Sequence, residues 1–178
     1  MTAPILPEES HVTRQGTLRI RPATASDLPL LLALIKELAA FEQAGDRVLA
    51  TESLLEESMF GVVKRAEAAL GFLADEPAAF AVFYPTFSTY LGRGCLHLED
   101  LYVRPERRKA GIGRIFLAYV ARVAEGRGCA TMEWSSLHWN EEARRFYLSL
   151  GARDEERWMF RLSGQSLEKL AHPGGQTG

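Results

Sequence analysis

The sequence is poor in cysteine and has no long apolar run. Its two cysteines, Cys95 and Cys129, cannot build a disulfide framework in a chain of 178 residues, so we expect a reducing compartment, the cytoplasm. No apolar run approaches the ~20 residues of a membrane-spanning helix. Residues 1–16 also lack the apolar core of a signal peptide. We therefore predict a cytoplasmic protein with no membrane partner.

An excess of charge of one sign and the common metal-binding patterns are also missing. The net charge of −2 gives no reason to expect a nucleic-acid partner. No two of the four histidines have i,i+4 spacing and the cysteines form no Cys-x-x-Cys pair, so we predict no metal site. The Gly-x-Ser-x-Gly elbow of many serine hydrolases is absent as well.

What the sequence does contain is a strand, a basic glycine loop and a helix in one stretch, LHLEDLYVRPERRKAGIGRIFLAYVAR. Leu96 and Leu98 are at even-numbered positions, whereas Leu101 and Val103 are at odd-numbered ones, so in a regular strand the two pairs would point to opposite faces. A strand alternates faces with period two, so one extra residue must lie between these pairs. We predict a β-bulge near Glu99–Asp100, which would splay neighbouring strands beside a site.

The glycine loop reads Arg108-Lys109-Ala110-Gly111-Ile112-Gly113 and precedes an apolar stripe with helical spacing. Glycines at a helix start let backbone N–H groups approach an anion, and the helix dipole favours negative charge. The loop therefore predicts a pyrophosphate site. It is not a P-loop, because Arg114 follows Gly113, and Phe116 replaces the third glycine of a dinucleotide fingerprint. The alternative is a solvated basic turn before an amphipathic helix.

Arg-x-x-Gly-x-Gly after a bulged strand resembles the acyl-CoA loop of the GNAT superfamily of N-acetyltransferases. The resemblance narrows to the diamine acetyltransferase family, which includes spermidine/spermine and thialysine acetyltransferases. Its motifs occur here in the same order, at Ile20–Thr24, Leu34–Ala39, Leu98–Asp100, Trp139–Glu141 and Phe146-Tyr147. The resemblance covers about Leu18 to Ala171 and implies that acetyl-CoA is the co-substrate.

The expected elements follow from periodicity, caps and turn residues. Strands are expected at 17–21, 66–74, 78–84, 96–103, 129–135 and 158–162, and helices at 27–42, 51–58, 112–126, 140–150 and 166–171. Their order predicts an α/β (α+β) fold of the GNAT type, with a mixed, mostly antiparallel sheet of about six or seven strands. The central strand is bulged and helices cover both faces. We expect a flexible leader at 1–16, one domain at 17–171 and a flexible tail at 172–178.

Glu99 is the candidate general base. A substrate amine is mostly ammonium at neutral pH and must lose a proton before it can attack a thioester. A carboxylate at the bulge attracts the cation and accepts that proton. The alternative is an edge glutamate in solvent.

Tyr147 is the candidate general acid, since a neutral phenol can protonate the departing sulfur of CoA. The resemblance supports this role, because Phe146-Tyr147 matches the family's Phe-Tyr pair. Its spacing alone is equally that of a core tyrosine on an apolar helix face.

The resemblance implies the remaining site residues. The expected CoA-binding residues are Leu101, Tyr102, Val103, Arg108, Lys109, Ala110, Gly111, Ile112, Gly113, Asn140, Glu141, Glu142, Ala143 and Tyr147. The expected amine-binding residues are Phe41, Glu42, Glu99, Glu133, Trp134, Ser135 and Glu156.

We therefore expect an N-acetyltransferase that acts by direct transfer on a small primary amine: thialysine-like, lysine-like, a diamine or a polyamine. Ser88-Thr89-Tyr90 is similar to the thialysine-type members and favours a short amine. Two alternatives stay open, a protein N-terminal or lysine acetyltransferase and a non-catalytic acyl-CoA-binding regulator. The resemblance also implies a homodimer, with Trp158 and the last strand as the contact region.

Overall fold

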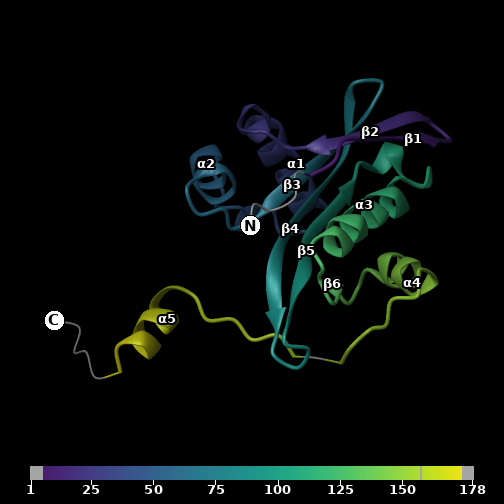
Figure 1. The fold of residues 1–178 in the computed structure, drawn as a ribbon. Coiled ribbons are helices and arrows are strands. Elements are labelled where there is room, and N and C mark those ends of the chain that lie inside the picture. The colour runs from purple at the N-terminus through teal and green to yellow at the C-terminus, as the bar shows by residue number, and fades with distance from the viewer. Residues whose placement is uncertain (1–5, 157, 174–178) are drawn as a thin grey trace. The chain divides into compact units, whose positions relative to one another are not determined.

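The computed structural model describes residues 6–156 and 158–173, and the backbone forms two compact units, Met1–Ser135 and Ser136–Gly178. The described part of the first unit contains a six-stranded sheet in the order β1-β2-β3-β4-β5-β6 (Figure 1). The strands are β1 (Glu9–Thr13), β2 (Gly16–Pro22), β3 (Glu67–Leu73), β4 (Glu76–Ser88), β5 (Arg93–Val103) and β6 (Met132–Trp134). Each neighbouring pair is antiparallel except β5–β6, which is parallel. This confirms the predicted mixed, mostly antiparallel sheet.

The hairpin between β3 and β4 turns through two residues. Leu73 pairs with Glu76, and Ala74 and Asp75 between them have φ of 48° and 65°. Two positive φ angles are typical of a type I′ turn, whose twist matches that of the strands. The turn therefore begins one residue earlier than the gap between the strands expected at 66–74 and 78–84.

β4 continues to Ser88, although residues 85–94 were expected to form a loop. Its pairing with β3 ends at Phe83, while its pairing with β5 continues to Ser88 opposite Arg93. From Tyr84 onwards β4 thus has a strand on one side only, where Pro85 is tolerated. Thr89 to Gly92 remain as the connection.

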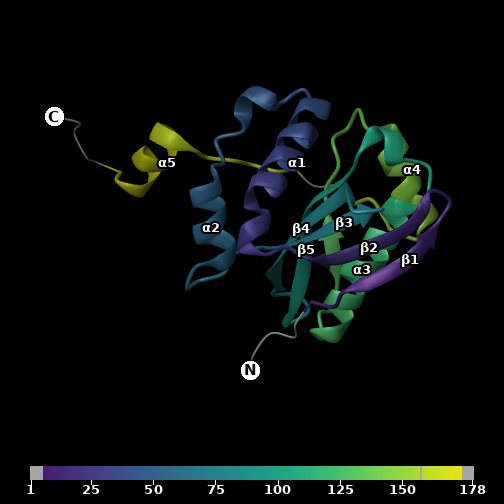
Figure 2. The ribbon, with the colours of Figure 1, turned by 90° about the horizontal axis from the view of Figure 1, so that it is seen from above.

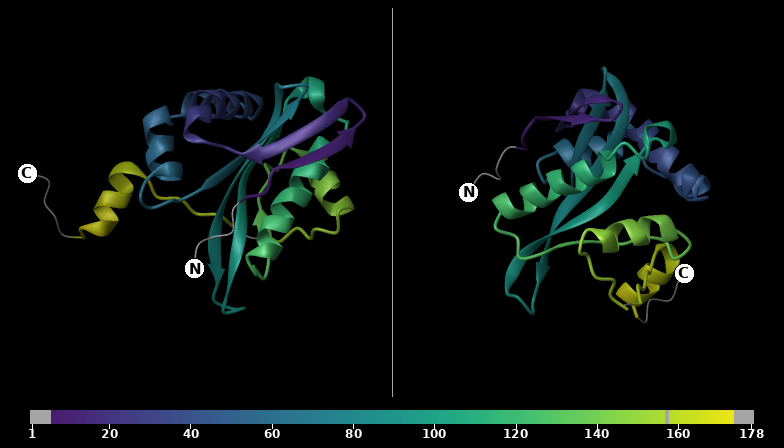
Figure 3. Two further views of the ribbon diagram at one scale, coloured as in Figure 1. Left: turned by 45° about the horizontal axis from the view of Figure 1, so that its top comes forward. Right: turned by 90° about the vertical axis from the view of Figure 1, so that its right-hand side faces the viewer.

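Helices cover both faces of the sheet, as predicted. α1 (Leu28–Phe41) and α2 (Glu52–Phe60) pack on one face, and α3 (Ile112–Gly126) lies on the other (Figure 2). The core under α1 and α2 is formed by buried side chains, Leu31, Leu34, Met59, Leu70, Phe72, Phe80, Val82 and Tyr102. The predicted apolar stripe of α3 is buried at Ile112, Phe116, Tyr119, Val120 and Val123, and Figure 3 shows this helix running along the strands.

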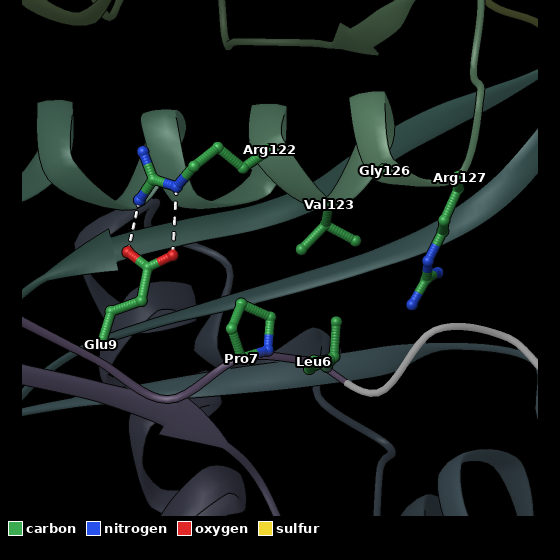
Figure 4. Close-up of a pocket in the computed structure, with 7 residues that line it drawn as sticks. All are labelled: Leu6, Pro7, Glu9, Arg122, Val123, Gly126 and Arg127. Carbon is green, nitrogen blue, oxygen red and sulfur yellow. Dashed lines mark hydrogen bonds and ion pairs between the residues drawn. The ribbon is translucent and has the colours of Figure 1, made fainter.

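Part of the stretch expected to be a flexible leader is ordered, which corrects that expectation for Glu9–Thr13. These residues form the edge strand β1, and a strand this short and polar is not visible from alternation alone. Glu9 forms an ion pair with Arg122 of α3, and the Tyr119 hydroxyl donates to the Pro7 carbonyl at 2.9 Å. Leu6 and Pro7 line a small cavity under α3 (Figure 4). Residues 1–5 lie outside the described chain.

The second unit contains α4 (Glu141–Ser149) and α5 (Gly164–Ala171). The strand expected at 158–162 is wrong, because the described residues there have no regular structure. A strand needs a paired edge for its N–H and C=O groups, and residue type alone does not supply one. Residue 157 and most of the expected tail, 174–178, lie outside the described residues. Within the described chain no helix is long and apolar enough to cross a bilayer.

Gly71 on β3 generates a stability prediction. A Cβ added there would lie 2.6 Å from the Phe116 ring, which is fully buried and cannot move away freely. We expect Gly71→Ala to destabilise the fold by about 1–3 kcal/mol through overpacking, measured by urea denaturation. Gly94→Ala on β5 is the control, because a Cβ there meets nothing within 4 Å. Equal stability of the two variants would contradict this packing.

Candidate active site

The predicted bulge is confirmed at Glu99. Phe83 of β4 pairs with Leu98 and the preceding Val82 pairs with Asp100, so Glu99 is the extra residue. The parallel pairing of β5 with β6 runs from Leu96 to Leu98 and stops there, opposite Trp134. The bulge therefore coincides with the last residue pair that joins these two strands.

Polar side chains from three strands meet beside the bulge. Tyr84 pairs with His97, and His97 pairs with Glu133, so the three residues form one row across β4, β5 and β6. The Tyr84 hydroxyl donates to Glu99 Oε2 at 3.2 Å, and Thr86 Oγ1 donates to Glu133 Oε1 at 3.5 Å. His97 Nε2 lies 3.6 Å from Glu99 Oε2 and Nδ1 lies 3.9 Å from Glu133 Oε1. Glu99 and Glu133, both predicted site residues, are thus brought together around an imidazole.

Asp100 is a site candidate that the sequence analysis missed. It pairs with Val82, whose side chain belongs to the core under α1, so Asp100 points to the same face of the sheet. Burial, together with the charges of Glu99 and Glu42, raises the pKa of Asp100 to about 7. Burial also raises the pKa of Glu42. The parity change at the bulge was the available signal, because it moves the residue after Glu99 to the opposite face.

The end of α1 contacts the glycine loop through Arg108. The guanidinium lies 4.3 Å from the centre of the Phe41 ring and 5.9 Å from that of Tyr102, and its Nε donates to the Val103 carbonyl at 3.0 Å. Arg108 therefore has partners of its own within the first unit. Cation–π contact and the hydrogen bond hold it against α1.

The main chain of the loop has the geometry expected for an anion site. Lys109 and Gly111 have φ of 61° and 89°, and Ala110 is buried between them. The Ile115 N–H donates to the Gly111 carbonyl, so the N–H groups of Ile112, Gly113 and Arg114 come before the first helical hydrogen bond. A Cβ added to Gly111 would meet nothing within 4 Å, so the loop surface is open. These features fit a pyrophosphate.

The second unit carries the other predicted residues. Asn140 caps α4 as predicted, because its Oδ1 accepts from the Ala143 N–H at 3.2 Å, and Glu141 and Glu142 are exposed in the first turn. Tyr147 is half-buried on this helix, its ring centre 5.4 Å from that of Phe146, and burial raises its pKa.

Three further predicted residues lie on β6, directly after it, and in the second unit. Trp134 is half-buried on β6, Ser135 follows it and is exposed, and Glu156 is exposed in the irregular segment after α4. Leu101 to Val103 continue β5 past the bulge, where the Tyr102 side chain is buried in the core.

Comparison with known proteins gives consistent matches. The model of the acetyltransferase (GNAT) family matches residues 32–152. Thialysine N-epsilon-acetyltransferase of Bos taurus is 34% identical, covering 85% of this chain and 96% of its own. L-ornithine N5-acetyltransferase NATA1 of Arabidopsis thaliana is 26% identical, covering 93% and 92%. Among solved structures, an integron cassette protein from V. cholerae has a similar fold, with a TM-score of 0.73, 24% identity and coverage of 87% and 98%.

Asp100 makes the stability of the chain depend on pH in a definite direction. Between pH 3.8, its ordinary pKa, and about 7, its folded value, the folded chain holds a proton that the unfolded chain has lost. Stability should therefore fall as pH rises through this window. Asp100→Asn cannot ionise, so we expect its stability advantage over the unsubstituted chain, measured by urea midpoints, to grow from about pH 4 to pH 7. Asp75→Asn in the exposed hairpin turn is the control, and an advantage independent of pH would rule out the raised pKa.

Proposed function

Since this chain belongs to the GNAT family of acetyltransferases, as the family match over most of its length establishes, we propose that it acetylates the primary amine of a small cationic molecule. The proposal rests on a group of acidic side chains at the bulge, which we call the acidic face. Glu42, Glu99, Asp100 and Glu133 lie on it or beside it, and within the described chain no lysine or arginine forms an ion pair with any of them. Such a face attracts a cation.

The co-substrate fits the first unit through the loop and the strand before it. The N–H groups of Ile112 and Gly113, with the Lys109 side chain, would hold the pyrophosphate, and the main chain of Leu101 to Val103 would hold the pantetheine arm. On the family resemblance, Asn140 to Ala143 at the start of α4 are also proposed as CoA-binding residues. When bound, acetyl-CoA supplies the activated acetyl thioester.

Glu99 performs the first proton transfer in this proposal. Its carboxylate accepts a proton from the ammonium group, whose deprotonation at neutral pH costs about 4–5 kcal/mol for a lysine-like amine. The Tyr84 hydroxyl bonded to Glu99 fixes the carboxylate, and its own pKa is raised by burial and by the Glu99 charge, so it stays a donor. Tyr147 Oη gives a proton to the departing sulfur, and its raised pKa keeps it protonated at neutral pH.

The proposed substrate is a short amine such as thialysine or ornithine, after which the relatives are named. Ser88 closes β4, and Thr89 and Tyr90 follow in its connection to β5, so this tip supplies no charge for the far amino group of a long polyamine. A thiol-release assay with acetyl-CoA should test thialysine, ornithine, lysine, diamines, spermine and an N-terminal peptide. Turnover of the peptide alone would favour protein acetylation, and CoA binding without any turnover would favour a regulator.

Dimerisation is proposed on the family resemblance alone. The expected contact region includes Trp158 and the residues after it. Multi-angle light scattering should give twice the chain mass of 19.8 kDa, and a monomer mass across the working concentration range would contradict the proposal.

Glu99 and Tyr147 are expected to act at opposite ends of the transfer, which pH can separate. Glu99→Gln keeps size but removes proton acceptance, so its kcat/KM should fall most near pH 7 and recover as the amine becomes neutral. Tyr147→Phe removes only the hydroxyl and should lose about 10²–10⁴-fold in kcat without recovery at high pH.

Both profiles are measured under conditions where chemistry limits turnover. Circular dichroism checks that each variant is folded. If Tyr147→Phe keeps full kcat, Tyr147 is a packing residue and not the general acid. If the kcat/KM of Glu99→Gln is lowered equally at every pH, Glu99 is not the general base.

A further inference from the structure

His97 contacts two carboxylates beside the bulge, those of Glu99 and Glu133. Its side chain is 19% exposed, whereas those of Glu99 and Glu133 are 53% and 52% exposed. Nε2 faces Glu99 and Nδ1 faces Glu133, at 3.6 Å and 3.9 Å. The ring lies against that of Tyr84, with the two centres 5.0 Å apart. Stacking and cross-strand pairing thus hold the imidazole with each nitrogen directed at an acid.

The proton balance of amine acetylation creates a need for such a group. An ammonium substrate loses two protons as the N–C bond forms and the C–S bond breaks, with no oxidation or reduction. One of them replaces the proton that Tyr147 gives to the sulfur, and the other is left on Glu99. The carboxylate must release this second proton before it can act again.

Among the side chains that contact the two carboxylates, one is suited to take this proton. On β4, the Tyr84 hydroxyl already donates to Glu99, and Thr86 already donates to Glu133. Neither can readily accept a proton, and burial and the Glu99 charge raise the pKa of Tyr84 further. An imidazole accepts at one nitrogen and donates at the other. Of the side chains that contact Glu99, His97 is therefore the one suited to take its proton.

Resting on the acetyl transfer proposed above, we propose that His97 is a proton relay from Glu99 to Glu133. Nε2 takes the proton from Glu99 Oε2, the proton on Nδ1 passes to Glu133 Oε1, and solvent removes it from that half-exposed carboxylate. Both distances exceed the ~3.2 Å of a hydrogen bond, so each transfer includes a small side-chain movement. His97 acts through Glu99 and positions no substrate itself.

His97→Gln tests the relay, because glutamine keeps polar contacts but cannot carry a proton. We expect kcat to fall about 10-fold or more near pH 7, with KM changed less than about twofold. Added imidazole buffer should restore kcat in proportion to its concentration, and should leave the unsubstituted enzyme unchanged. Glu133→Gln should lower kcat in the same way, and the double variant should lose little more, since the two residues act in one path. His11→Gln on β1 is the matched control and should keep full activity.

Two results would overturn the relay. One is full kcat in His97→Gln with chemistry limiting, and the other is a loss that imidazole does not restore. The unsubstituted enzyme separates this failure from failure of the proposed function. If it acetylates a small amine and either of these results is seen, the relay is wrong and the proposed function stands. If it acetylates no small amine in the same assay, the proposed function is wrong, and the relay with it.

Discussion

One extra residue in β5 controls where the polar groups of the first unit gather. If β5 kept a regular register after Leu98, Glu99 would pair with Val82 and Asp100 with Ala81. Asp100 would then point toward the α3 face, where the sheet is packed with apolar side chains. With the insertion, Asp100 shares the face of Val82, close to Glu42 and Glu99. A one-residue change of register moves every following side chain to the opposite face. The bulge therefore creates the acidic face and ends the β5–β6 pairing at the same point.

Holding these carboxylates together costs free energy, which the surrounding structure must supply. Removing a carboxylate from water and placing it beside like charges disfavours ionisation, and this is why the pKa of Asp100 rises to about 7. Apolar side chains on both sides of the bulge hold it in place, Leu98 before it and Tyr102 after it, both buried. A cationic substrate would relieve the repulsion, so the site is better suited to its ligand than to solvent.

Arg108 joins two parts of the first unit that the sequence separates widely. It follows β5 and begins the loop proposed for the pyrophosphate, yet its guanidinium stacks on Phe41 at the end of α1. The next residue after Phe41 is Glu42, whose charge raises the pKa of Asp100. The loop and the acidic face thus share a support, and a change in Arg108 is expected to disturb both.

The sequence by itself determined the features that depend on neighbours along the chain. Strand parity located the bulge, helical spacing located α3 and its buried stripe, and Asn140 marked the start of α4, because each pattern is complete within a few residues. Only the tertiary structure decided that Glu42 comes close to Asp100, that His97 lies between two glutamates and that Arg108 turns toward α1. It also showed that β1 is ordered and that 158–162 forms no strand. These features depend on cross-strand register and on packing between distant elements. Neither can be predicted from a local stretch of sequence.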